Sequence, residues 1–201
     1  MPIYNAPLAD MKFILNDVFN ADQFWQSNEN LAHVDSATAE AILEEMAKFA
    51  QNVTLPLNRT GDEEGATFSN GAVTTPAGFK EAFKQYAEGG WIGLAADEEW
   101  GGQGMPKMLT VLADEMLFAT NPSFMLYPLL SVGAGMALNS YASQEQKETY
   151  LPKIYSGEWS GTMCLTEPHA GTDLGIIKTK AERNEDGTYN ITGTKIFITG
   201  G

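Results

Sequence analysis

The segment from Met163 to Asp173 separates two parts of the chain that require different folds. Before it, apolar residues recur every three or four positions, which is the spacing that buries one side of a helix. After it, over 178–199, residues alternate at every second position as in strands, with Asp186-Gly187 as a hairpin turn. The pattern predicts an α+β chain, with an N-terminal all-α helical domain followed by the first strands of an antiparallel β-barrel or sandwich.

The same change of spacing predicts the domain boundaries. We expect a helical extension over 1–35, a helical domain over 36–158 and the start of a β domain over 159–201. Two or three strands cannot form a stable sheet without a hydrophobic partner. The β domain is therefore expected to be incomplete, as if the chain were cut at Gly201.

Start and stop signals place one long helix near the beginning of the helical domain. Ser36 is expected to cap this helix, because its hydroxyl can accept from a free amide of the first turn. Pro56 is expected to end it, because proline cannot donate a helical hydrogen bond. Residues 57–75 are polar and rich in turn formers, so they are expected to form a solvated loop.

The run 124–138 is almost wholly apolar. It is too short to span a bilayer, so it predicts a central buried helix. Gly133 and Gly135 lie inside this run, and each costs about 1 kcal/mol of helix stability relative to alanine. We therefore expect a neighbour to approach the helix closely at both glycines, either another helix or a ligand.

Charge and cysteine content limit the classes of function. A net charge of −14 argues against binding to nucleic acid or to an anionic membrane, both of which attract basic surfaces. A single cysteine excludes an internal disulfide framework and fits a reducing compartment. The N-terminus lacks a signal-peptide pattern, and no apolar run reaches the ~20 residues of a membrane span. The expected location is cytoplasmic.

The segment 163–173 also carries the strongest functional pattern. Pro168 lacks an N–H and forces a bend, and Gly171 allows a close approach of the backbone to a bound group. Thr166 and Thr172 supply hydroxyls, while the segment has no Lys or Arg. This combination suits a flat, polar-edged, neutral ring better than a bare phosphate, which favours cations. An ordinary Pro/Gly loop between strands is the alternative that composition alone favours.

A second segment, from Gly193 to Gly201, reads Gly-Thr-Lys-Ile-Phe-Ile-Thr-Gly-Gly. Together the two segments resemble the flavin-binding signatures of the acyl-CoA dehydrogenase family. These signatures are a Thr-Glu-Pro-x-Ala-Gly-Ser/Thr-Asp loop and a Gly-x-Lys-x-aromatic-Ile-Thr strand. The turn over 90–104 and the helix over 143–159 resemble two further parts of the family pattern.

The resemblance extends over about residues 36–201, which is only the front part of a family member. Residues 1–35 resemble the N-terminal extension of one subgroup of the family, the subgroup that contains 3-methylmercaptopropionyl-CoA dehydrogenase. The resemblance therefore implies a helical domain and the beginning of the family's middle domain.

The resemblance implies contacts to FAD along the first segment. Met163, Leu165 and Thr166 are expected along the pyrimidine end of the flavin ring, through backbone groups and the Thr166 hydroxyl. Gly171 and Thr172 are expected on the pyrophosphate side. Thr172 stands where the family often has serine, keeps the hydroxyl, and also borders the CoA arm of the substrate.

The second segment is expected on the other side of the ring. Phe197, Ile198 and Thr199 would line the dimethylbenzene and N5 side, with Thr199 as the candidate hydrogen-bond donor to N5. A fixed donor at that position stabilises the charge that N5 gains when the flavin is reduced.

By this resemblance the chain is the N-terminal portion of an FAD-dependent acyl-CoA dehydrogenase, an oxidoreductase of fatty acid metabolism. Such enzymes oxidise an acyl-CoA to a 2,3-enoyl-CoA. Their general base is a glutamate of the C-terminal domain, so we expect the base beyond Gly201 and no activity from this chain alone. The expected partners are the acyl-CoA substrate, an electron-transfer flavoprotein, and further copies in a homo-oligomer when the protein is full length.

Two kinds of alternative stay open. One is another flavoenzyme of the same fold, such as an acyl-CoA oxidase, a nitroalkane oxidase or a DNA-associated relative, the last of which the acidic charge opposes. The other is a non-enzymatic helical module that binds an acyl chain or a partner. Such a module has no need of two flavin-binding segments.

Metal binding and thiol catalysis have little support. His33, His169 and Cys164 are the only histidines and thiol, which is too few for a zinc site, and His169 is assigned no role. Alternation places Cys164 on the side opposite Met163 and Leu165, which predicts a buried structural thiol and not a nucleophile.

Overall fold

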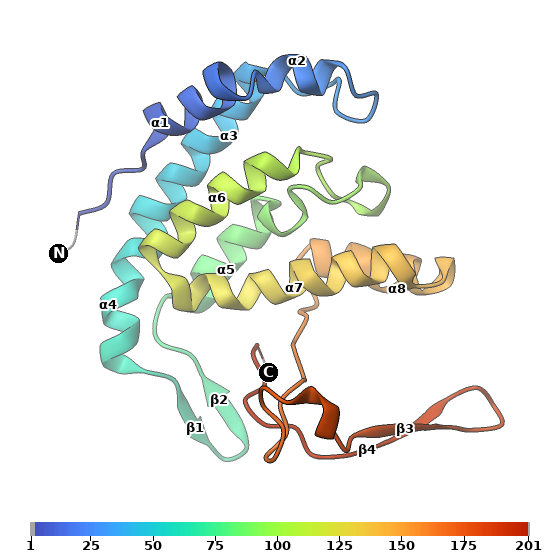
Figure 1. The fold of residues 1–201 in the computed structure, drawn as a ribbon. Coiled ribbons are helices and arrows are strands. Elements are labelled where there is room, and N and C mark those ends of the chain that lie inside the picture. The colour runs from blue at the N-terminus through green and yellow to red at the C-terminus, as the bar shows by residue number, and fades with distance from the viewer. Residues whose placement is uncertain (1–2, 201) are drawn as a thin grey trace. The chain divides into compact units, whose positions relative to one another are not determined.

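The computed structural model describes residues 3–200, in two compact units divided after Gly161 (Figure 1). The first unit is built from helices with one small hairpin, and the second holds a pair of antiparallel strands. The predicted α+β class is therefore confirmed.

The first unit consists of helices joined by short turns and one hairpin. Its elements are α1 (Leu8–Phe13), a π-helical turn (Ile14–Val18), α2 (Ala21–Gln26), α3 (Ser36–Phe49), a second π-helical turn (Ala50–Thr54), α4 (Leu55–Glu64), β1 (Thr67–Ser69), β2 (Ala72–Thr74), α5 (Phe79–Glu88), 3-10 turns at Trp91–Gly93 and Glu98–Trp100, α6 (Lys107–Thr120), α7 (Pro122–Tyr141) and α8 (Gln144–Tyr155). Among the described helices, none is both long enough and apolar enough to cross a bilayer.

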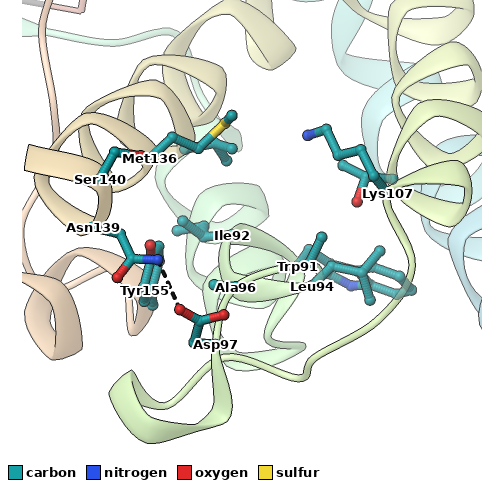
Figure 2. A pocket seen from close by; sticks show the side chains of 13 residues that line it. Trp91, Ile92, Leu94, Ala96, Asp97, Lys107, Met136, Asn139, Ser140 and Tyr155 are labelled. Atoms are coloured by element: carbon teal, nitrogen blue, oxygen red, sulfur yellow. Dashed lines mark hydrogen bonds between the residues drawn. The ribbon is translucent and has the colours of Figure 1, made fainter. Parts of the chain in front are cut away.

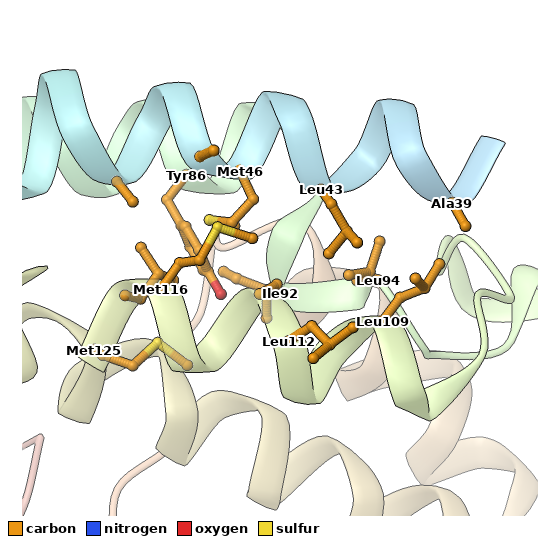
Figure 3. Packing of buried hydrophobic residues seen from close by; sticks show 14 of the residues in the cluster. Ala39, Leu43, Met46, Tyr86, Ile92, Leu94, Leu109, Leu112, Met116 and Met125 are labelled. Atoms are coloured by element: carbon orange, nitrogen blue, oxygen red, sulfur yellow. The ribbon is translucent and has the colours of Figure 1, made fainter. Parts of the chain in front are cut away.

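The core of this unit lies between α3 and α6, where the apolar faces of both helices meet (Figure 3). Leu43 on α3 and Leu109 and Met116 on α6 are completely buried. Burying a side chain of this size contributes roughly 1.5–3 kcal/mol relative to leaving it exposed. Phe124 adds an aromatic cluster, with its ring centroid 5.8 Å from that of Tyr86 in an edge-to-face arrangement.

The long helix near the beginning differs from the prediction at both ends. Asp35, and not Ser36, is the N-cap, and its carboxylate accepts a hydrogen bond of 2.7 Å from the Thr38 amide. Pro56 does not end the helix, because it lies in the first turn of α4, where no helical hydrogen bond needs its missing N–H. Much of the stretch expected to be a loop is therefore helix.

A buried polar network fixes the second π-helical turn. The hydroxyl groups of Thr54 and Thr120 lie 2.8 Å apart, and the Asn121 side-chain amide donates to the Thr54 carbonyl at 3.1 Å. The Asn121 side-chain oxygen also accepts from the Phe124 amide at 3.0 Å and caps α7. Because all three polar side chains are fully buried, the network joins the end of the π-helical turn to the junction of α6 and α7.

The rest of the stretch expected to be a loop forms the hairpin of β1 and β2. The strands are antiparallel, with Thr67 opposite Thr74. The turn uses Asn70 and Gly71, both with positive φ, which are the residue types that a two-residue hairpin turn requires.

The apolar sequence of α7 predicted a central buried helix, but one part of its surface is exposed. Phe124 and Met125 are buried, whereas Leu126 and Met136 are 46% and 55% exposed. The elements that pack against α7, chiefly α6 and α8, therefore leave part of its surface uncovered within the described residues.

The two glycines of α7 have different surroundings. A Cβ at Gly135 would lie 2.6 Å from the aromatic ring of Tyr155, so the predicted close approach is confirmed there. A Cβ at Gly133 would have no described atom within 4 Å, so the prediction is wrong at that position.

The second unit contains a 3-10 turn (Leu174–Ile176) and the strands β3 (Lys180–Arg183) and β4 (Tyr189–Thr192). The strands pair antiparallel, with Lys180 opposite Thr192. They are shorter than the alternating sequence suggested, and all of their side chains are exposed. The predicted turn is confirmed, with Gly187 at a φ of 87° and the Thr188 amide donating to the Asp186 carboxylate.

Alanine substitution of the two α7 glycines should have opposite effects. Gly133→Ala is expected to raise the free energy of unfolding by about 0.5–1 kcal/mol, because alanine favours the helix and meets no neighbour. Gly135→Ala is expected to lower it by about 1–3 kcal/mol, because the Tyr155 ring must move. Urea denaturation followed by helical circular dichroism would compare them. Equal stabilisation by both changes would contradict the close contact at Gly135.

Candidate functional site

The two segments singled out in the sequence lie side by side in the second unit. The Met163 amide donates to the Thr199 carbonyl at 3.2 Å, and the Ile196 amide donates to the Thr166 carbonyl at 2.9 Å. These bonds arise because both segments are extended and antiparallel at Met163 and Thr199. The Lys195 ammonium adds a third link, a hydrogen bond of 2.8 Å to the Leu165 carbonyl. The sequence patterns therefore meet in one surface.

Glu167 is the buried centre of this arrangement, with a side chain that is 2% exposed. One carboxylate oxygen accepts from the Lys178 amide at 2.8 Å. The other accepts from the Thr179 amide and from the Lys195 ammonium, both at 2.9 Å. The Glu167 carboxylate thus links the first segment, to which it belongs, with the residues just before β3 and with the second segment.

The donors around Glu167 explain its acidity. Hydrogen bonds from Thr179, from the Lys178 amide and from the Lys195 ammonium hold the pKa of the Glu167 carboxyl well below its ordinary value of 4.5. His169 lies close by, with Nε2 at 3.4 Å from the carboxylate and at 3.1 Å from the Ile176 carbonyl. Glu167 is therefore ionised at neutral pH and has no need of a further partner.

A tight turn projects the corner of the first segment into solvent. The backbone groups of Glu167 and Ala170 are hydrogen-bonded in both directions, at 2.9 and 3.0 Å. Pro168 and His169 form the exposed corner between them. Ala170 is buried, so the turn is anchored at both of its ends.

Gly171 and Thr172 follow this turn and are both exposed. A Cβ at Gly171 would have no described atom within 4 Å, and its φ lies outside the left-handed region. Within residues 3–200, neither residue has a hydrogen bond to the second segment. The structure therefore brings Met163, Leu165 and Thr166 against the second segment but leaves Gly171 and Thr172 apart from it.

The second segment presents an exposed aromatic ring. Phe197 has a φ of 54°, which is uncommon for a non-glycine residue, and its side chain is 85% exposed. Ile198 and Thr199 beside it are half-buried.

Cys164 is exposed, so the prediction of a buried thiol is wrong. The strand-like segment around it has a bridge to one neighbour, and no described layer covers its outer side. Among residues 3–200, no three His, Cys, Asp or Glu side chains gather in a way that could hold a metal ion.

Sequence reasoning gave no role to Glu167 or Lys195, although both belong to the matched patterns. The available signal was complementarity: the first segment contains acidic residues but no Lys or Arg, and the second contains Lys195 but no acidic residue. Gly193 was also given no role. A Cβ there would lie 2.8 Å from the Thr179 Cα, so glycine allows the second segment to pass close to the residue that donates to Glu167.

The Glu167 carboxylate should make the stability of the second unit depend on pH. A carboxyl whose pKa is lowered by folding stabilises the fold above its ordinary value of 4.5, and this contribution is lost as the pH falls further. Glu167→Gln should remove this dependence and speed amide exchange at Lys178 and Thr179 by about tenfold at neutral pH.

Hydrogen exchange measured by NMR between pH 3 and 7 would test this, with the exposed Glu182→Gln on β3 as the matched control. If Glu167→Gln kept the pH dependence of the parent chain, the role given to the buried carboxylate would be wrong.

Comparison with known proteins identifies the family of the chain. Residues 36–158 match the family model described as "Acyl-CoA dehydrogenase, N-terminal domain". The 3-methylmercaptopropionyl-CoA dehydrogenase of Ruegeria pomeroyi is 41% identical over 198 residues, covering 98% of this chain and 34% of the relative. The chain thus spans about a third of the length of the curated relatives that it matches over nearly its whole length.

Solved structures give the same assignment. The butyryl-CoA dehydrogenase of Megasphaera elsdenii has a TM-score of 0.70 and 28% identity, over 81% of this chain and 41% of the other. An acyl-CoA dehydrogenase of Bacillus anthracis complexed with FAD has a TM-score of 0.67 and 28% identity, over 83% of this chain and 27% of the other. The resemblance drawn from the two segments is thereby confirmed, and the chain belongs to the acyl-CoA dehydrogenase family.

Proposed function

We propose that this chain is the N-terminal part of an FAD-dependent acyl-CoA dehydrogenase that oxidises an acyl-CoA to a 2,3-enoyl-CoA. The observation that carries the proposal is the joining of the segments 163–172 and 193–200 by hydrogen bonds into one surface. Each segment matches a flavin signature of the family to which the chain belongs, and the Bacillus anthracis relative is described as complexed with FAD.

The surface fits a flavin in its chemistry. Met163 and Leu165 expose apolar side chains. Thr166 follows Leu165 directly, and Thr199 is bonded to Met163 through the backbone, so each segment brings one hydroxyl near these side chains. Lys195 is the only Lys or Arg of the two segments, and its ammonium is already bound to Glu167 and to the Leu165 carbonyl. A neutral ring with polar edges suits such a surface better than an isolated anion.

Each predicted contact residue takes a proposed role on this surface. Met163, Leu165 and Thr166 would hold the pyrimidine end of the flavin. Gly171 and Thr172 would face the pyrophosphate, where open space beside Gly171 permits close approach and where Thr172 also borders the CoA arm. The backbone link between the segments would hold Met163 and Thr166 in place against the second segment before FAD binds.

Phe197, Ile198 and Thr199 would lie along the dimethylbenzene and N5 side. When bound, FAD supplies the acceptor for the hydride that leaves the β-carbon of the substrate. The Thr199 hydroxyl would donate toward N5 and stabilise the charge that develops there.

The base that removes the α-proton is proposed to come from outside residues 1–201. Glu167 is an unsuitable base, because three donors occupy its oxygens and hold its pKa well below the ordinary value. An acyl-CoA substrate, an electron-transfer flavoprotein as electron acceptor and assembly into a homo-oligomer complete the proposal.

FAD binding tests the proposal directly. In a longer polypeptide that contains this chain, Gly171→Ala should weaken FAD binding by about tenfold or more, because the added methyl group occupies the space that the cofactor needs. Its stability without FAD should not fall, since the methyl group meets no described atom. Gly133→Ala is the matched control, because it also adds a methyl group in open space. A parent protein without visible flavin absorbance after FAD addition would overturn the proposal.

A second experiment examines the chemical step. Thr199→Val should slow flavin reduction by an acyl-CoA by about 10- to 100-fold while FAD is retained, because valine keeps the volume and the backbone link to Met163 but loses the hydroxyl. Anaerobic stopped-flow bleaching of the flavin measures this rate. An unchanged rate would remove Thr199 from the reaction.

A further inference from the structure

The helical unit contains a pocket of about 210 Å³ that the proposed flavin surface does not use (Figure 2). Its walls come from the 3-10 turn at Trp91–Gly93 and the loop that follows, the first turn of α6, the second half of α7, and Tyr155 at the end of α8. All of these elements belong to the first unit, so the pocket is described without reference to the second.

Thr110 provides the first indication of a ligand. Its residue is 8% exposed and lines the pocket, yet its buried hydroxyl has no hydrogen-bond partner among the residues that the structure describes. Buried hydroxyl groups in folded proteins are nearly always hydrogen-bonded, because leaving them unpaired is unfavourable. A ligand with an acceptor atom beside Thr110 would satisfy it.

Lys107 provides the second indication. It lies three residues before Thr110 on α6, so both side chains project from the same face of the helix. Figure 2 shows its ammonium turned into the pocket toward Met136. None of the ion pairs formed within residues 3–200 includes Lys107. A cation and a hydroxyl donor from one face of α6 therefore both line the pocket.

Asp114, on the same helix, is the acidic residue whose charge interacts with Lys107, and it does not line the pocket. Burial raises the pKa of Asp114 to about 6, against the opposing effect of Lys107. At neutral pH the carboxyl is still mostly ionised, but it forms no ion pair within 4 Å of Lys107 among the described residues. Lys107 therefore has no direct carboxylate partner in the part of the chain that the structure describes.

The remaining walls define the rest of the ligand. Ile92, Leu94 and Met136 present apolar side chains. Asp97 lies on the side away from Lys107 and accepts a hydrogen bond of 2.7 Å from Asn139 (Figure 2). Its carboxylate would repel an anion, so an anionic group belongs at the Lys107 end and an uncharged chain along the apolar walls.

We propose that this pocket binds a small monocarboxylic acid with a short aliphatic chain, its carboxylate at Lys107 and Thr110 and its chain against Ile92 and Met136. An apolar cavity of about 150 Å³ holds a six-carbon ring, so 210 Å³ accommodates an acid of about four to six carbons. The inference goes beyond the proposed dehydrogenase function and does not depend on it.

Pentanoate is the probe, titrated into the isotope-labelled 201-residue chain and followed by NMR. Amide shifts should centre on Thr110 and Met136, with a Kd of about 1–10 mM, as expected for a ligand of this size. Lys107→Met should weaken binding by about fivefold or more, and the isosteric Thr110→Val should also weaken it. Lys147→Met on α8 is the matched control and should leave the affinity unchanged.

1-Pentanol tests the role of the charge, because it has the same chain length without a carboxylate. The proposal requires it to bind at least about fivefold more weakly than pentanoate. Equal binding of the alcohol, shifts away from the pocket, or an unchanged affinity in a folded Lys107→Met variant would each overturn the proposal. Circular dichroism establishes that each variant is folded before its affinity is compared.

Discussion

An ionised carboxylate that is almost completely buried is the constraint on which the second unit depends. Glu167 can remain charged only while the Lys178 and Thr179 amides and the Lys195 ammonium surround it. The strands of this unit bury almost no side chains, so apolar burial contributes little to its order. A polar interaction therefore holds the segments 163–173 and 193–200 together.

The helical unit differs from the second unit, because its stability comes chiefly from the apolar layer between α3 and α6. Its buried polar groups act at the points where the helices change direction. Asn121 caps α7 and holds the Thr54 carbonyl, and the Thr54 and Thr120 hydroxyls lie against each other. In the helical unit, buried polar groups therefore fix the junctions between helices, while apolar packing stabilises the unit as a whole.

Much of the architecture could be predicted from the sequence, because it depends on local chemistry. Hydrophobic spacing predicted the helices, and Asp186-Gly187 makes the hairpin turn that its sequence predicts. The family resemblance located the two segments that the fold joins.

What could not be predicted depends on partners far away in the chain. Pro56 was misjudged because a π-helical turn before it places it in a first turn, where proline is acceptable. The exposed face of α7 and the exposure of Cys164 depend on which surfaces other elements cover, and composition does not contain that information. The structural role of Glu167 could not be predicted, because its hydrogen-bond donors lie 11, 12 and 28 residues further along the chain.

The π-helical turn between α3 and α4 also constrains how the sequence can change in length. Such a turn holds one residue more than regular helical geometry needs. Deleting one residue from Ala50–Val53 would remove this extra residue, so a continuous α-helix could form while the later residues keep nearly the same positions around the helix axis. Inserting one residue would instead rotate every later residue by about 100°. The Thr54 carbonyl would then point away from Asn121, and Gly61 would leave its contact with the Phe79 ring. This region should therefore accept the loss of one residue more readily than the gain of one.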